Sequence, residues 1–353
     1  MTKTIYFAVV GCGHIGKRHA TMIERQEGAK LIALCDILPA EKTGTEEFDV
    51  PYFRNYEEML AALPSLTEGE TVVNICTPNG LHATMAEQAL ERSFHVVVEK
   101  PMTLRRTDAE QLLSTALRCG KQLFCVMQNR YSPPSVWLKE LVTEGRLGKI
   151  YNVIVHCFWN RDSRYYQSGG WHGTKEMDGG TLFTQFSHYI DLLYWLFGDL
   201  KNIEGRLYDF NHAGLTEFED SGSILFDFVK EGSGALHYST SVWDANMETS
   251  LTIIAEKGSV KVAGQYMNEV KYCHIKEYEM PQLPPTNPGN DYGLYKGSAQ
   301  NHHYVIENVV SVLQGNSAIT TNALEGMKVV DIIERIYQAA EKRENCKIKA
   351  QQT

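Results

Sequence analysis

Short apolar runs alternate with amphipathic segments through the first third of the chain. The runs predict strands, and recurrence of apolar residues every three or four positions predicts helices at Leu81–Arg92 and Thr107–Cys119. The predicted strands are Ile5–Val10, Leu31–Cys35, Thr71–Cys76, His95–Val98 and Leu123–Met127. This alternation is typical of a parallel sheet covered by helices on both faces.

The pattern changes after residue 130, where strands follow one another across short turns. The predicted strands here are Ile150–Trp159, Gly222–Phe228, Ala235–Val242, Ser250–Ala255, Ser259–Val262 and Glu269–Ile275; helices are predicted near Ser135–Glu144 and at Leu324–Ala340, and a loop at Met280–Asn290. Successive strands indicate a mostly antiparallel sheet. With 353 residues, the chain is long enough for two α/β domains, predicted at 1–127 and 128–353.

A glycine pattern follows the first strand directly. Gly11, Gly13 and Gly16 form G-x-G-x-x-G, and Asp36 follows the last of them by twenty residues. In a strand–turn–helix setting, such glycines let the backbone approach a pyrophosphate, and the later acid accepts hydrogen bonds from the ribose. An ordinary glycine-rich loop is the alternative. The context favours a Rossmann domain, and Asp36 favours NAD over NADP because its charge repels a 2′-phosphate.

Bulk composition excludes several classes of function. The formal charge of −9 argues against nucleic-acid binding, and no apolar run approaches transmembrane length. The eight cysteines are scattered without a C-x-x-C pair, so we expect reduced thiols, a cytoplasmic protein and no metal site.

Ligands of such sheets lie beyond the carboxyl ends of the strands, so the residues that follow each strand are candidates. Lys100, in Glu99-Lys100-Pro101, can donate a hydrogen bond to a substrate hydroxyl or help to move its proton. An exposed lysine without function is the equal alternative. We predict that cofactor contacts come from Gly11, Gly13, His14, Ile15, Gly16, Asp36, Thr77, Pro78, Asn79, His82, Glu99, Lys100 and Gln128.

A second cluster lies in the segment from Met177 to Asp191. The pair Gly179-Gly180 opens a predicted helix, on which Thr181, Thr184, Gln185 and His188 are spaced to share one face. Polar side chains on an otherwise apolar helix suggest a cavity, and His188 is a plausible general base. The alternative is a buried histidine satisfied at a helix interface.

These motifs together resemble the Gfo/Idh/MocA oxidoreductases over essentially the whole chain. GCGHIG, TPNGLH, EKP and GGTLFTQFSHYIDLL occur in that family's order. The resemblance implies a Rossmann domain followed by an α/β domain whose open sheet mediates oligomerisation. It assigns catalysis to Lys100 and His188. Many members have aspartate four residues before the histidine, whereas this chain has Thr184, so inositol dehydrogenase activity is less expected.

The run Val126–Tyr131 and the segment from Cys157 to Gly198 are similar to bacterial dehydrogenases that oxidise the 3-hydroxyl of UDP-2-acetamido-2-deoxy-D-glucuronate. These enzymes serve surface polysaccharide synthesis, and their branch also has a polar residue in place of the aspartate. Predicted substrate contacts are Asn129, Arg130, Arg161, Arg164, Trp171, Thr184, Gln185 and His188. A solvated loop with assorted charges is the alternative for the arginine segment.

The resemblance therefore predicts an NAD-dependent sugar-nucleotide dehydrogenase that forms a homotetramer or homodimer. Three alternatives remain open: dehydrogenation of a free sugar or cyclitol, glycoside cleavage through transient oxidation by bound NAD, and a non-catalytic NAD sensor.

Overall fold

The computed structural model describes residues 3–167 and 169–351, with the backbone alone for 343–351. Its contacts divide the chain into two compact units. The first holds the residues up to Gln128 together with Asn301–Val330, and the second holds Asn129–Gln300 together with the residues from Asp331 onward. Seven of the eight cysteines form no disulfide, and the side chain of Cys346 lies outside the described residues.

The first unit contains a six-stranded parallel sheet in the order β3-β2-β1-β4-β5-β6. The strands are β1 (Ile5–Val10), β2 (Ala29–Cys35), β3 (Tyr52–Phe53), β4 (Thr71–Ile75), β5 (His95–Val98) and β6 (Leu123–Cys125). Strands β4 and β5 are buried at every position, which requires cover on both faces of the sheet. The predicted Rossmann-like sheet is confirmed.

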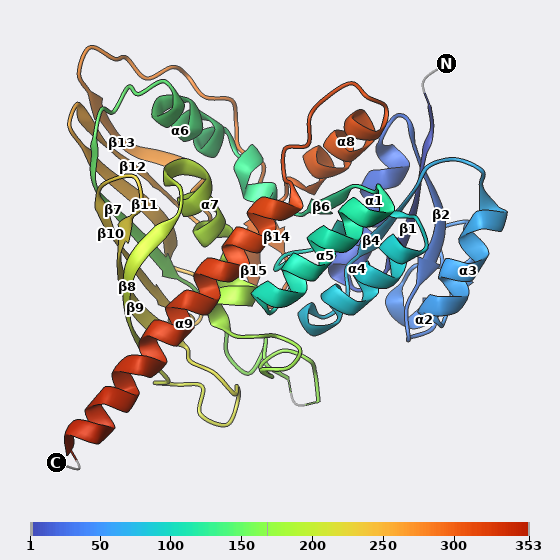
Figure 1. Cartoon of the computed structure of the whole chain (residues 1–353), viewed down its shortest axis with the longest axis horizontal. Coiled ribbons are helices and arrows are strands. Elements are labelled where there is room, and N and C mark those ends of the chain that lie inside the picture. Colours follow the sequence, from blue (N-terminus) through green and yellow to red (C-terminus); the bar gives the residue numbers. More distant parts are fainter. Residues whose placement is uncertain (1–2, 168, 352–353) are drawn as a thin grey trace. The chain divides into compact units, whose positions relative to one another are not determined.

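Helices alternate with these strands along the chain (Figure 1). They are α1 (His14–Arg25), α2 (Ala40–Thr43), α3 (Tyr56–Leu66), α4 (His82–Glu91), α5 (Arg106–Cys119), α8 (His302–Leu313) and the start of α9 (Ala323–Gln351). The sequence pattern predicted α4, α5 and α9 but missed α3 and α8. Helix α3 contains Pro64, which obscures its pattern, although Asn55 caps it by accepting from the backbone N–H of Glu58 at 3.1 Å.

The second unit is built on a seven-stranded sheet in the order β13-β12-β11-β7-β10-β9-β8. The strands are β7 (Ile150–Phe158), β8 (Leu200–Tyr208), β9 (Ser221–Phe228), β10 (Ser233–Ser239), β11 (Glu248–Ala255), β12 (Gly258–Ala263) and β13 (Glu269–Ile275), with a separate hairpin of β14 (Gly289–Asp291) and β15 (Lys296–Ala299). Only the β7–β10 pair is parallel, so the predicted mostly antiparallel sheet is also confirmed.

One face of this second sheet is covered and the other is open. Helices α6 (Pro133–Thr143) and α7 (Ser187–Phe197) lie on the same side of the sheet (Figure 1). Alternate strand residues such as Val155 and Leu236 are buried, whereas Leu225 and Tyr272, which point to the opposite face, are 56% and 53% exposed. Within the described part of the chain, every helix is too short or too polar to cross a membrane.

Candidate active site

The turn after β1 requires glycine and leaves space for a ligand. Gly11 has φ +85°, and a Cβ there would lie 2.5 Å from the carbonyl oxygen of Cys76. A Cβ on Gly16 would overlap the carbonyl of Gly11, whereas one on Gly13 would meet nothing within 4 Å. Helix α1 starts at His14, followed by Ile15, with no acidic side chain in its first turn. This turn and helix start fit the pyrophosphate of a dinucleotide.

Asp36 is held in place at the end of β2. Its carboxylate accepts the backbone N–H of Cys12 at 2.7 Å and that of Leu38 at 2.8 Å. These bonds orient the carboxylate beside the glycine turn, where it can also accept from ribose hydroxyls. Burial, reinforced by the charge of Asp36, raises the thiol pKa of both Cys12 and Cys35 to about 12. The two cysteines are therefore protonated, unreactive parts of this wall.

His82 links the segments that follow β4 and β5. Its Nδ1 lies 2.8 Å from the carbonyl oxygen of Pro101, and its Nε2 lies 2.9 Å from that of Thr77. Burial lowers the pKa of His82, and a neutral imidazole donates to only one of these carbonyls at a time. Pro78 and the buried Asn79 follow Thr77 in the same loop. His82 thus has a supporting position among the predicted cofactor residues.

Glu99 is a buried carboxylate at the centre of a hydrogen-bond cluster. Its Oε1 lies 3.0 Å from Nε2 of His19 and 3.4 Å from Nε2 of His302. Its Oε2 accepts the backbone N–H of Lys100 at 3.1 Å. Because Nδ1 of His19 accepts from the amide of Asn74 at 2.9 Å, Nε2 of His19 carries the proton and donates to Glu99.

Charge within this cluster follows from burial and hydrogen bonding. Burial raises the pKa of Glu99, but hydrogen bonds from His19 and His302 outweigh it and hold the pKa well below its usual range. Burial lowers the pKa of His302 to about 4. Ligand atoms of the three side chains lie within 4.8 Å of one another, as around a metal ion. The tautomer of His19 already explains the geometry as donation to a carboxylate, so a metal is not required.

The second unit presents its candidate groups around the start of α7. A π-helical turn, Leu182–Phe186, precedes α7 and contains Thr184 and Gln185. The hydroxyl of Thr184 donates to a carboxylate oxygen of Asp178 and lies 3.0 Å from its backbone carbonyl oxygen. His188 follows in the first turn of α7 and is 3% exposed. Wide helical turns of this kind occur frequently at functional sites.

Gln185 connects this helix to Arg161. Its Oε1 accepts from Nε of Arg161 at 2.7 Å, and its amide donates to the hydroxyl of Tyr165 at 2.9 Å. Arg161 is 2% exposed and donates further to the carbonyl oxygens of Asn160 and Lys296. Its guanidinium also faces the rings of Trp159, Tyr165 and Tyr295 at 4.8–5.2 Å. A full positive charge is therefore buried beside the helix of His188 among neutral groups.

The remaining predicted substrate residues differ in their surroundings. Arg130 is buried and forms a two-pronged ion pair with Asp191, while Asn129 accepts from the hydroxyl of Ser298 at 2.5 Å. Arg164 is partly exposed and pairs with Asp162 and Asp244. Trp171 stacks on His172 with ring centroids 3.8 Å apart, and Gln128 is buried in the first unit.

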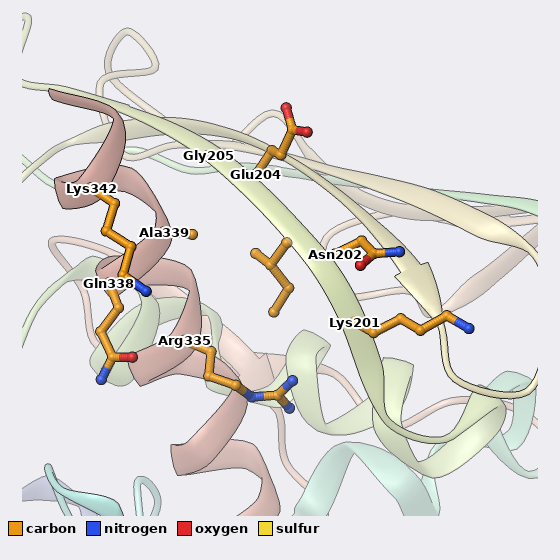
Figure 2. A pocket seen from close by; sticks show the side chains of 9 residues that line it. Lys201, Asn202, Glu204, Gly205, Arg335, Gln338, Ala339 and Lys342 are labelled. Carbon is orange, nitrogen blue, oxygen red and sulfur yellow. The ribbon is translucent and has the colours of Figure 1, made fainter. Parts of the chain in front are cut away.

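A cavity of about 600 Å³ lies elsewhere in the second unit, between β8 and α9. Figure 2 shows Arg335, Gln338 and Lys342 along the helix, with Lys201, Asn202 and Glu204 along the strand. None of the predicted site residues lines it. Its arginine, Arg335, forms ion pairs with Asp199 and Asp331.

Sequence reasoning proposed Lys100 and His188 as candidates but missed groups that the structure shows near them along the chain. His19 and His302 contact Glu99, and Asp178 contacts Thr184. Asp178 directly precedes the glycine pair before the helix of His188, and this position could have drawn attention to it. His302 comes from a helix 203 positions beyond Glu99, and no local pattern points to it.

Comparisons with known proteins identify the family of this chain. Residues 5–127 match the NAD-binding Rossmann-fold model of the GFO_IDH_MocA oxidoreductase family, and residues 136–261 match a C-terminal domain model of the same family. The chain is 24% identical to D-glucoside 3-dehydrogenase of Escherichia coli over 352 residues, which cover 95% of each protein.

Two solved structures span the whole chain. The WlbA dehydrogenase of Chromobacterium violaceum, in complex with NADH and UDP-GlcNAcA, is 32% identical with a TM-score of 0.85, over 96% of this chain and 94% of that one. The WlbA dehydrogenase of Bordetella pertussis, in complex with the same ligands, is 29% identical with a TM-score of 0.83, over 96% and 97%. The protein is an NAD-dependent sugar oxidoreductase and belongs to the Gfo/Idh/MocA family.

Proposed function

We propose that this enzyme oxidises the 3-hydroxyl of UDP-2-acetamido-2-deoxy-D-glucuronate, using NAD as the hydride acceptor. The main support is the full-length likeness to two proteins solved with NADH and UDP-GlcNAcA, at 32% and 29% identity. Oxidation at position 3 also fits the name of the full-length relative D-glucoside 3-dehydrogenase. The product would feed the synthesis of surface polysaccharide sugars in the cytoplasm.

In this proposal the two units have different roles. The first unit holds NAD, with the pyrophosphate on the turn of Gly11, Gly13 and Gly16 and the ribose on Asp36. Bound NAD supplies an acceptor for the hydride that leaves the carbinol carbon. The second unit binds the sugar nucleotide and provides the general base.

His188 takes the proton of the substrate hydroxyl, since a neutral imidazole can accept it near physiological pH. Lys100 donates a hydrogen bond to the same oxygen and stabilises the negative charge that develops there. Glu99 supports Lys100 by accepting its backbone N–H, and His19 and His302 hold the carboxylate of Glu99. In this proposal His188 and Lys100 carry out the chemistry, and Glu99, His19 and His302 support Lys100.

Recognition of an anionic substrate by a protein of charge −9 needs local positive potential. Arg161, beside Gln185, supplies this positive potential. Its guanidinium donates to neutral oxygens and faces aromatic rings, whereas nearby carboxylates are bound to other groups. Arg164 and Arg130 have acidic partners and contribute less net charge. Asn129, Trp171, Thr184 and Gln185 complete the proposed substrate surface.

Self-association through the open sheet face is part of the proposal, as a homotetramer or homodimer. Leu225, Ile254 and Tyr272 on β9, β11 and β13 are 56%, 41% and 53% exposed. The three strands are spread across one sheet face, and exposed apolar side chains on such a face are typical of surfaces that a second copy covers.

Purified protein should be mixed with NAD and UDP-2-acetamido-2-deoxyglucuronate while nicotinamide absorbance is followed, with an aminotransferase and glutamate present to draw off the ketone. NADH formation that needs the nucleotide, and fails with the free sugar acid, supports the proposal. NADH formation with glucosides or free sugars favours the second candidate, which the full-length likeness to D-glucoside 3-dehydrogenase suggests. Sugar release from an aryl glycoside without net NADH would favour the redox glycosidase.

A further inference from the structure

Asp178 is a buried acid at the entrance to the catalytic helix. Its side chain is 1% exposed, and one carboxylate oxygen accepts the backbone N–H of Gly173 at 2.9 Å. The other oxygen accepts the hydroxyl of Thr184. Burial of a carboxylate is unfavourable unless its charge is stabilised by hydrogen bonds or used by a neighbouring group.

Thr184 connects this carboxylate to the helical segment of His188. Thr184 lies in the π-helical turn and His188 follows four positions later in the first turn of α7, a spacing that puts helical side chains on the same side of the backbone. Thr184 cannot hold a charge itself, but its hydroxyl is hydrogen-bonded to one. Asp178 therefore adds a negative charge near the start of this helical segment, besides that of Asp191 on α7, which is paired with Arg130.

The charge of Asp178 also acts on titratable groups of three other segments. Burial raises the pKa of Tyr165 and Tyr166, in the segment after β7, and the charge of Asp178 adds to the effect. It also adds to the raised pKa of Glu219, before β9, and of Tyr337 in α9. Arg161 is the positive group in this set, across Gln185 and Tyr165.

We propose that Asp178 is the positioning acid of His188: it supplies, through Thr184, the negative charge that stabilises the imidazolium formed when His188 takes the substrate proton. This inference deepens the proposed function and rests on it for the catalytic step. The proton moves from the hydroxyl to His188, the hydride moves to NAD, and Asp178 stays ionised throughout.

The direct test follows the imidazole of His188 by NMR in protein labelled at histidine, with a His188→Gln variant to assign the signal. Asp178→Asn keeps the acceptor for Gly173 and removes the charge. We expect its His188 titration midpoint to fall by about one pH unit, the size expected when an opposite charge nearby is lost. Asp178→Asn combined with Thr184→Asp returns a charge to the helix and should restore the midpoint.

Asp227→Asn is the matched control, because Asp227 lies on β9 of the same unit and binds the amide of Asn202. Its His188 midpoint should equal that of the wild type. An unchanged midpoint in folded Asp178→Asn protein would overturn the inference. If that variant does not fold, Thr184→Asp in the wild-type background serves instead, and a midpoint that does not rise would count equally against it.

Kinetics then separate this inference from the proposed function. With the sugar nucleotide, Asp178→Asn should lower kcat about tenfold, which corresponds to about 1.4 kcal/mol, with little change in KM. The acidic limb of kcat/KM should move to lower pH. If the wild type does not oxidise the sugar nucleotide while the NMR midpoint still moves, the proposed substrate is wrong and the role of Asp178 stands.

Discussion

Glu219 has a carboxyl group that folding removes almost completely from water. Its Oε1 accepts the hydroxyl of Tyr238 at 2.9 Å and that of Tyr337 at 2.8 Å, so the acid links β10 to α9. Burial raises the pKa of Glu219 to about 7 from its ordinary value of 4.5, against the lowering effect of the two tyrosine hydrogen bonds. Near neutral pH the folded protein therefore holds this acid partly protonated, whereas the unfolded chain has it ionised.

The sign of the pH dependence follows from proton counts. Between pH 4.5 and 7 the folded state binds a proton at Glu219 that the unfolded state has lost, so the free energy of unfolding falls as pH rises. The contribution is fully present below pH 4.5 and is lost above about 7. One pKa unit corresponds to about 1.4 kcal/mol, which makes the loss between pH 5 and 8.5 about 2.5 kcal/mol.

Glu219→Gln removes this titration and keeps the shape of the side chain. We expect the free energy of unfolding of the variant, relative to that of the wild type, to increase by about 2.5 kcal/mol from pH 5 to pH 8.5. Urea unfolding at several pH values measures the difference, in which the titration of all other groups cancels. Glu217→Gln, at an exposed acid in the same segment, controls for the loss of one negative charge. A difference between Glu219→Gln and wild type that stays constant with pH would refute the reasoning.

Three further predictions concern the backbone before the helix of His188, the cofactor and the proposed base. Gly180→Ala should lower the free energy of unfolding by about 1–3 kcal/mol in a denaturation assay, because φ is +134° and the new Cβ meets the hydroxyl of Tyr337. Gly214→Ala is the control: its φ is +81° but its Cβ would lie in open space, so the loss of stability should be smaller. Asp36→Ala should weaken NAD binding about 10- to 100-fold in calorimetry, because hydrogen bonds to a charged group contribute about 1.5–3 kcal/mol. An unchanged affinity for NAD would show that Asp36 is not part of the cofactor site. His188→Ala should reduce NADH formation about a hundredfold or more with NAD affinity intact, and near-normal turnover would eliminate it as the base.

The dinucleotide-binding segment could be predicted from sequence because its determinants are close together along the chain. The strand Ile5–Val10 was placed with its observed bounds, and the glycine turn and Asp36 follow it within 30 residues. Steric limits on Gly11 and the alternation of strands and helices are properties of neighbouring residues. The same holds for β13, whose predicted and observed bounds coincide.

Other elements were missed where the local pattern is weak. Strand β8 is the edge of its sheet and exposes most of its residues, so it lacks the clear alternation of a half-buried strand. Helix α8 follows the short hairpin strand β15 after two residues, and the sequence pattern did not predict it. The parallel pairing of β7 with β10 joins residues 81 positions apart, and the short turns between the other strands of this sheet give no sign of it.

The sequence by itself determined the fold class, the cofactor motif and the identity of Lys100 and His188 as candidates. Tertiary structure alone decided what surrounds them: His302 against Glu99, Arg161 against Gln185, and Tyr337 against Glu219. Local patterns follow from the sterics and burial of adjacent residues, whereas these contacts join side chains between 24 and 203 positions apart. Burial shifts the pKa values of such side chains only once the chain has folded, so the charges of the site can be worked out from the structure but not from local sequence patterns.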